Sequence, residues 1–187
     1  SDEAPEVIFV SIDATAHNEP VSVAAFDCPK VALLADTHHL ARPLRNALAY
    51  LCEEIFDFHI ALYNLRHAHF FRAAGLKNVH WLPALNVAGH TAPPATEMAK
   101  ETAEEILFIG QTGQYHPRRR RLLQTLQAHG LPLRQMETPV AEAARHCAAA
   151  RISFNCSLNG DPNMRLFEIM AAGGMALTDR LSAQSGL

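Results

Sequence analysis

Short apolar runs alternate with longer amphipathic stretches along the first part of the chain. The runs are nearly continuous in apolar or β-branched residues and too short for helices, which is typical of strands buried on both faces of a sheet. They predict strands over residues 7–13, 31–36, 58–63 and 79–83. The stretches between them predict helices over 42–54 and 65–74, the second one stopped by Gly75. This alternation is the pattern of a parallel α/β sheet.

The same alternation restarts after a polar interval. It predicts strands over 106–110, 131–136, 151–156 and 175–179, and helices over 117–129, 139–150 and 163–172. The interval itself, residues 89–104, combines loop residues with a Thr/Glu-rich stretch of little apolar periodicity, which indicates an interdomain linker. The expected fold class is therefore α/β, with two tandem Rossmann-like parallel-sheet units over residues 1–88 and 105–187.

The composition describes a globular protein and excludes two other classes. Of the 187 residues, 49% are hydrophobic and 19% are charged, which is too apolar for a disordered chain. No apolar run approaches the ~20 residues that span a bilayer, so no transmembrane segment is expected. The first residues lack the basic and then apolar pattern of a secretion signal, and a cytoplasmic location is expected.

The charge distribution argues against a nucleic-acid partner. Sixteen Lys and Arg against 19 Asp and Glu give a net charge of −3, without a global basic field. Residues 1–94 carry 6 basic and 10 acidic groups, whereas residues 95–187 carry 10 and 9. The second half is therefore the more favourable place for an anionic ligand.

The four cysteines predict neither a disulfide framework nor a structural zinc site. They are scattered, contain no CxxC pair, and have no histidines at zinc-finger spacing. Free and mostly buried thiols in a reducing compartment are expected, and no bound metal is predicted.

A polar loop that feeds a helix is the strongest local signal. Residues 159–163 are rich in Asn, Gly, Asp and Pro, and the helix after them presents Arg165 and Glu168 on neighbouring positions of one face. The helix N-terminus favours a phosphate, and a carboxylate one turn in can accept hydrogen bonds from ribose hydroxyls. The alternative is a surface ion pair at a helix start.

A second candidate phosphate-facing turn is formed by Gly110 to Gly113, directly after a predicted strand. It matches neither GxGxxG nor a Walker loop. The basic run 118–121 follows at once, but consecutive helical residues point in different directions. Only Arg118 or Arg119, nearest the helix start, could therefore meet a phosphate at the turn, and a solvated helix face remains the alternative.

The first unit offers one candidate loop, Asp36 to His39, directly after a predicted strand. In parallel α/β sheets ligands bind at the carboxyl ends of the strands. An Asp and two His in one loop could supply an acid–base group or two metal ligands. A metal site would need a third ligand, and adjacent histidines diverge.

These segments together resemble glycosyltransferases of the two-Rossmann GT-B type, and within them the CgeB-like, group 1 (family 4-like) bacterial proteins. The resemblance rests on Phe108 to Gly110 with the Arg-rich helix, and on the block from Asn155 to Asp179, which is similar to "strand, polar loop, R-x-F-E-x-x-A-x-G-G, strand, T-D". In the first half, the "D-x-H" loop at Asp36 and the "W-L-P" strand at 81–83 also resemble the family.

The resemblance implies a UDP- or GDP-sugar as co-substrate, with no metal and no permanently bound cofactor. Donor-binding residues would be Gly110, Gly113, Arg118, Arg119, Asn163, Arg165 and Glu168, with Glu168 on the ribose. Asp36 and His38 would be catalytic residues facing an acceptor that is a glycan, a lipid or a protein. The position eight residues before Glu168, where many relatives carry a second glutamate, is Gly160.

Both units have fewer predicted strands than a complete half of such an enzyme. The chain is therefore expected to be the central part of a longer protein and to self-associate through exposed apolar faces. Two alternatives stay open beside a transferase. One is a non-catalytic nucleotide- or glycan-binding protein with the same fold, and the other is an unrelated two-domain α/β protein such as a phosphate-ligand sensor.

Overall fold

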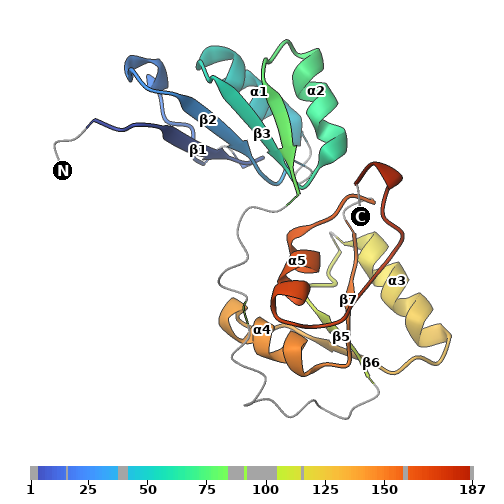
Figure 1. Ribbon diagram of the computed structural model, residues 1–187. Coiled ribbons are helices and arrows are strands. Elements are labelled where there is room, and N and C mark those ends of the chain that lie inside the picture. Colours follow the sequence, from blue (N-terminus) through green and yellow to red (C-terminus); the bar gives the residue numbers. More distant parts are fainter. Residues whose placement is uncertain are drawn as a thin grey trace. The chain divides into compact units, whose positions relative to one another are not determined.

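The chain folds into two compact α/β units, Ser1–Leu85 and Asn86–Leu187 (Figure 1). The computed structural model describes residues 4–15, 17–37, 42–83, 91, 105–114, 116–157 and 160–185. Each unit contains a four-stranded sheet in which all paired strands are parallel, so the expected fold class is confirmed. The segment expected as a linker, residues 89–104, lies outside the described residues apart from Thr91.

The first unit has its strands in sequential order across the sheet, β1-β2-β3-β4. Their bounds are Ile8–Ile12 for β1, Lys30–Leu34 for β2, Phe58–Leu62 for β3 and Val79–Leu82 for β4. Helix α1 covers Pro43–Glu53, and α2 covers Ala68–Ala73 after a 3-10 turn at Leu65–His67. The predicted helix over 65–74 is thus a 3-10 turn that continues into an α-helix.

Both helices of the first unit pack on the same face of its sheet. Leu51 of α1 and Phe71 of α2 belong to one core with Ala32 of β2. This follows from the strand order, because right-handed crossovers that all proceed in one direction leave their helices on one side. On the strands themselves, Phe9 is 60% exposed and Phe58 is 43% exposed.

The second unit has the strand order β6-β5-β7-β8. The strands are Ile106–Ile109 for β5, Leu133–Met136 for β6, Ile152–Asn155 for β7 and Ala176–Thr178 for β8. The helices are Pro117–Ala128 for α3, Val140–Ala149 for α4 and Met164–Ala171 for α5, followed by a 3-10 turn at Ala183–Ser185. Proline occupies the first turn of α3, where its missing N–H costs nothing.

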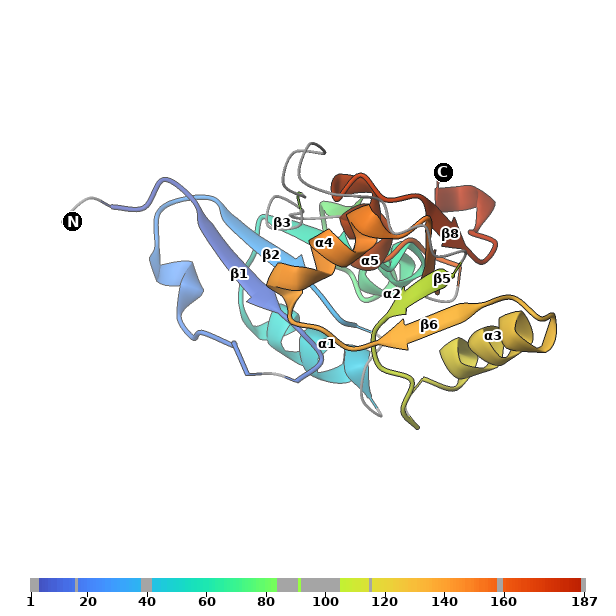
Figure 2. The ribbon, with the colours of Figure 1, turned by 90° about the horizontal axis from the view of Figure 1, so that it is seen from below.

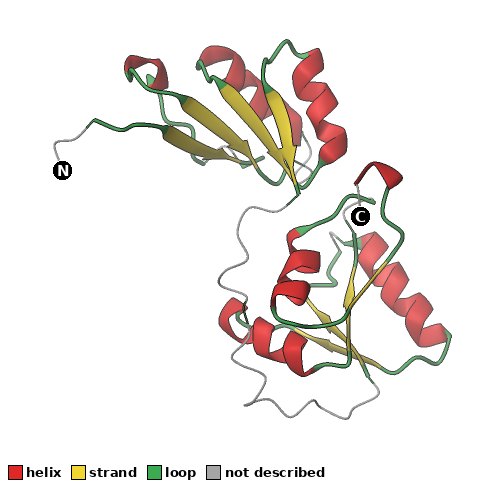
Figure 3. Ribbon diagram, in the orientation of Figure 1, coloured by secondary structure: helices red, strands yellow, loops and turns green. Residues whose placement is uncertain are grey.

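Helices cover both faces of this second sheet (Figure 3). Leu123 of α3 packs with Phe108 on one face. Cys147 of α4 and Ile169 of α5 pack with Leu107 on the other. Figure 2 shows α3 running beside β6. Because alternate residues of β5 face opposite helices, the strand is buried along its whole length, as its apolar sequence predicts.

The strand order of the second sheet reverses beside β5. The chain leaves β5 for β6 on one side, and then returns across β5 to β7 on the other. In open α/β sheets, ligands bind outside the carboxyl ends of the strands at such a topological switch point. The switch point lies between the turn after Ile109 and the segment after Asn155.

The cysteines are free, but only two are buried. Cys147 and Cys156 are buried, Cys28 is half-buried and Cys52 is exposed. The expectation of mostly buried thiols is therefore wrong for Cys52, which lies near the end of the amphipathic helix α1. Among the described residues, no helix is long and apolar enough to cross a membrane.

Candidate functional site

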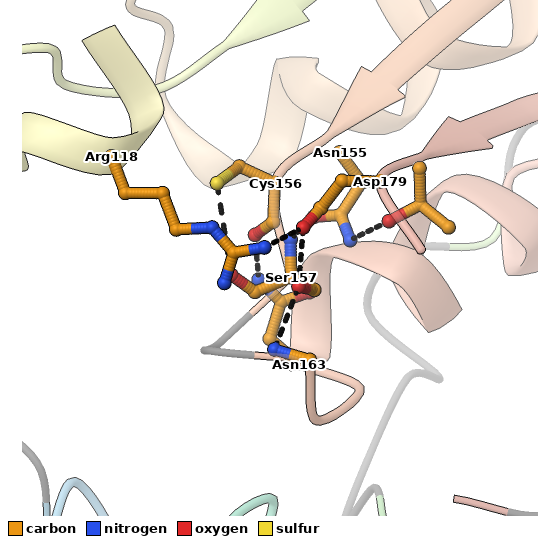
Figure 4. Close-up of polar contacts among 8 residues, drawn as sticks. Arg118, Asn155, Cys156, Ser157, Asn163 and Asp179 are labelled. Carbon is orange, nitrogen blue, oxygen red and sulfur yellow. Dashed lines mark hydrogen bonds and ion pairs between the residues drawn. The ribbon is translucent and has the colours of Figure 1, made fainter. Parts of the chain in front are cut away.

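Three segments of the second unit meet at the switch point. They are the turn after β5 with the start of α3, the segment between β7 and α5, and the residue directly after β8. Asp179, after β8, joins the other two segments, since it forms an ion pair with Arg118 of α3 and accepts hydrogen bonds from Ser157, after β7 (Figure 4). Residues far apart in sequence are thus brought to one edge of the sheet.

The turn after β5 is tied to α3 by Arg119. The Arg119 Nη1 donates to the main-chain oxygen of Gln111 at 2.7 Å, and its guanidinium lies over the Phe108 ring, 5.7 Å from the centroid. Gly110 has a φ of +143°, where a side chain would be strained. Gly113 is exposed and has open space where a Cβ would lie. Arg119 therefore fixes the shape of the Gly110–Gly113 turn.

The Arg119 guanidinium is a partly desolvated charge. Burial lowers the pKa of Arg119, and the nearby positive charge of Arg165 lowers it further, while Cys156 acts in the opposite direction. A guanidinium nevertheless keeps its proton in a protein. The effect of Arg165 on the pKa of Arg119 indicates that α5 brings a second positive charge into the region of Arg119.

Asp179 lies at the centre of the polar contacts drawn in Figure 4. Its carboxylate accepts hydrogen bonds from the Ser157 backbone N–H at 2.6 Å and from the Ser157 hydroxyl at 2.7 Å. It also forms an ion pair with Arg118. The register that pairs Asn155 with Thr178 sets the residues after β7 beside Asp179. The Asp179 side chain is 10% exposed, whereas that of Arg118 is 44% exposed.

Further hydrogen bonds hold the segment between β7 and α5. The Ser157 hydroxyl accepts from the Gly160 N–H at 3.0 Å, and the Gly160 carbonyl accepts from the Ser182 N–H at 2.7 Å. Asn163, the residue before α5, donates from Nδ2 to the Cys156 carbonyl at 2.8 Å. Its side chain makes no capping hydrogen bond to the helix. The segment is therefore anchored to the sheet at several points.

Arg165 and Glu168 form an ion pair on the first turns of α5. The Arg165 Nη1 lies 3.1 Å from the Glu168 Oε2, and their side chains are 31% and 13% exposed. The sequence spacing predicts this neighbourhood, since residues three apart share a helix face. Both charges also influence the buried Cys147 thiol, whose pKa is raised mainly by burial.

Each arginine at the switch point is oriented by a partner. Arg118 pairs with Asp179, Arg119 with the Gln111 carbonyl and the Phe108 ring, and Arg165 with Glu168. Held guanidinium groups bind phosphate or carboxylate at a smaller entropic cost than mobile ones. The arrangement is therefore suited to an anionic ligand, with the exposed guanidinium of Arg118 as its most accessible donor.

The candidate residues of the first unit, Asp36 and His38, follow β2 in the sequence. Asp36 is exposed and has a φ of +47°, and His38 lies outside the described residues. The neighbouring Thr37 is 2% exposed, and its hydroxyl is hydrogen-bonded to Nδ1 of His67 at 2.8 Å. Asn64 Nδ2 lies 3.4 Å from the same hydroxyl. This polar cluster, in which Thr37 and Asn64 are buried, joins the ends of β2 and β3.

Asp179 and Ser157 contribute to the site but were not among the candidate site residues predicted from the sequence. Asp179 directly follows β8, and Ser157 comes two residues after β7, so their positions at carboxyl ends of strands were a usable signal. What connects them is the parallel pairing of β7 with β8, which a strand pattern alone does not specify. No group of three or more His, Cys, Asp or Glu in the described part of the chain could hold a metal ion.

A comparison with protein-family models gives a match within the second unit. A family model described as glycosyl transferase-like matches residues 112–187, which include α3 and all later elements of the unit. The match supports a glycosyltransferase family and general glycosyl transfer for this part of the chain. No curated protein and no solved structure matches the chain.

Proposed function

We propose that the chain transfers a sugar from a nucleoside-diphosphate sugar to an acceptor, and that the second unit binds the donor. One observation carries the proposal: the glycosyl transferase-like match covers the residues that gather charge at the switch point. Arg118, Asp179, Arg165 and Glu168 all lie within residues 112–187. The fold and the family similarity thus both favour the carboxyl edge of the second sheet as the donor-binding site.

In this proposal the diphosphate lies between the starts of α3 and α5. Arg118 and Arg165 contact its oxygens, and Arg119 keeps the Gly110–Gly113 turn in place against the donor. Positive groups fixed in advance stabilise the negative charge that develops on the leaving diphosphate. A helix N-terminus adds a favourable dipole at the same place, here that of α5 after Asn163.

Glu168 is proposed to accept hydrogen bonds from the ribose hydroxyls. Its carboxylate lies one turn into α5, and Arg165 orients it at 3.1 Å. The first unit is proposed to face the acceptor, a glycan, lipid or protein, through Asp36 and His38. Thr37, which lies between these two residues in the sequence, is hydrogen-bonded to His67 at 2.8 Å.

The ribose assignment is tested with Glu168→Ala. Loss of a charged acceptor should weaken binding of UDP or GDP by about tenfold, while binding of inorganic pyrophosphate, which has no ribose, should be weakened clearly less, through the loss of the Arg165 partner alone. Glu142→Ala, which removes an exposed carboxylate from α4, is the matched control. Isothermal titration calorimetry measures each affinity. Equal loss of UDP and pyrophosphate binding, or no loss at all, would contradict the role of Glu168.

Turnover separates a transferase from a binding protein. A transferase releases nucleoside diphosphate from its donor sugar, slowly to water and faster with an acceptor. Binding of nucleoside diphosphates without any such release would favour the non-catalytic alternative.

A further inference from the structure

Asp179 makes contacts with two segments that would both face the proposed ligand. Through Ser157 it holds the start of the segment between β7 and α5 at 2.6 and 2.7 Å. Through Arg118 it holds the side chain at the start of α3. The two segments come from opposite sides of the switch point, so a single carboxylate fixes their relative position.

The environment of Asp179 is that of an orienting group and not of a ligand contact. Its side chain is 10% exposed, and both carboxylate oxygens accept hydrogen bonds from Ser157. The Arg118 side chain is 44% exposed, and a guanidinium has five N–H donors, of which Asp179 can engage only some. Arg118 can therefore bind an anion while Asp179 holds it.

The contact between Asp179 and Ser157 also restrains residues further along the segment between β7 and α5. The Ser157 hydroxyl donates to Asp179 and accepts from the Gly160 N–H at 3.0 Å. Gly160 is bound in turn by the Ser182 N–H at 2.7 Å. A further hydrogen bond joins the ends of β7 and β8, from Asn155 Nδ2 to Thr178 Oγ1 at 3.2 Å, directly before this network. Loss of the carboxylate would thus release both Arg118 and the anchored segment.

We propose that Asp179 is the positioning residue of the anion site: it holds Arg118 and Ser157 so that both sides of a bound diphosphate are in place before binding. The proposal rests on the proposed function, because it takes a nucleoside diphosphate as the ligand. Asp179 itself does not contact the ligand. Its contribution to affinity is made through Arg118 and through the backbone at Ser157.

The test is a double-mutant cycle read by calorimetry with UDP, GDP and inorganic pyrophosphate as probes. Asp179→Ala and Arg118→Ala should each weaken diphosphate binding by about tenfold. The double variant should bind only slightly more weakly than either single variant, because neighbouring groups that act through one contact are not additive. Pyrophosphate should be affected as strongly as UDP or GDP, since the defect lies on the phosphate side.

Two further variants distinguish the positioning role of Asp179 from a general effect on folding or on surface charge. Arg120→Ala removes an exposed positive charge from the same helix and should change the affinity by less than about twofold, as expected for a surface charge. Asp179→Asn keeps an oxygen that can accept a hydrogen bond from the Ser157 N–H, so the fold should be preserved. It removes the negative charge, so the contact that holds the Arg118 side chain should be weakened. It therefore carries the test if Asp179→Ala fails to fold.

Wild-type affinity in both Asp179 variants would overturn the proposal, and so would losses that simply multiply in the double variant. These results would leave the proposed function standing, because the wild type would still bind the probes. Failure of the wild-type chain to bind any of the three probes would instead overturn the proposed function together with the role of Asp179.

Discussion

At the scale of single residues, His59 is a buried titratable group in the first unit. It is 3% exposed in β3, and its Nδ1–H donates to the Lys77 carbonyl at 2.8 Å. Its Nε2 is buried and has no hydrogen-bond partner among the described residues. Protonation would bury a charge and an unpaired N–H, so burial lowers the pKa of His59, while the Lys77 carbonyl opposes this effect.

This environment predicts how stability depends on pH. The pKa of His59 is lower in the folded chain than its ordinary value of 6.5, so the unfolded chain binds the extra proton more readily. The stabilisation from neutral His59 is therefore complete above pH 6.5 and is lost as the pH falls below it. One proton can lower the free energy of unfolding by at most about 1.4 kcal/mol per pH unit.

The comparison that isolates this effect uses His59→Leu. The variant should be less stable than the wild type at pH 8, because the Lys77 carbonyl loses its donor, but its stability should fall less between pH 7 and pH 5. Urea denaturation at each pH gives both curves. The same decline in both proteins would show that another group causes it.

At the scale of elements, Gly174 allows α5 to lie close to α4. A Cβ at this position would lie 2.6 Å from the Cys147 carbonyl oxygen of α4 and 3.1 Å from the Ile169 side chain of α5. The Gly174 N–H donates to the Ile169 carbonyl at 2.9 Å, which ends the helix. Glycine is required here by the close approach of backbone.

Gly174→Ala should therefore lower the free energy of unfolding by about 1–3 kcal/mol, the usual cost of overpacking. Gly113→Ala is the matched control for stability, because a Cβ there would meet nothing within 4 Å. Its effect should be small. Chemical denaturation of the two variants makes the comparison, and a Gly174→Ala variant as stable as Gly113→Ala would contradict the packing argument.

The hydrophobic pattern was sufficient to predict the elements of the second unit, because most of its strands are short and mainly apolar runs, β6 being the most polar. The predicted helix over 163–172 corresponds to α5 at Met164–Ala171, and its Arg165–Glu168 neighbourhood follows from helical geometry. The contacts of Asp179 could not be predicted in this way. They depend on the register of β7 with β8 and on the reversal of strand order beside β5, which are tertiary properties.

The same distinction holds for the first unit. The loop after β2 was a predictable place for polar residues, but the partner of Thr37 is His67, thirty positions along the chain. Helical spacing says nothing about such a pair, since it forms only when β2 and β3 lie side by side. Candidate residues can therefore be recognised from local position, whereas their partners require the topology.

At the scale of the whole molecule, the chain is two α/β units of different construction. The first places its strands in sequential order with both helices on one face, and the second reverses its strand order and is covered on both faces. Only the second unit has a switch point among the described strands, and the glycosyl transferase-like match lies there. Self-association through exposed apolar side chains such as Phe9 stays a prediction.

The proposed function requires that the switch point of the second unit binds a nucleoside diphosphate. Calorimetric titration of the wild-type chain with UDP and with GDP tests it most directly. Saturable binding of at least one of them is expected at one site per chain, and added salt should weaken it because arginines make the contacts. Absence of binding by both nucleotides at low salt would contradict it.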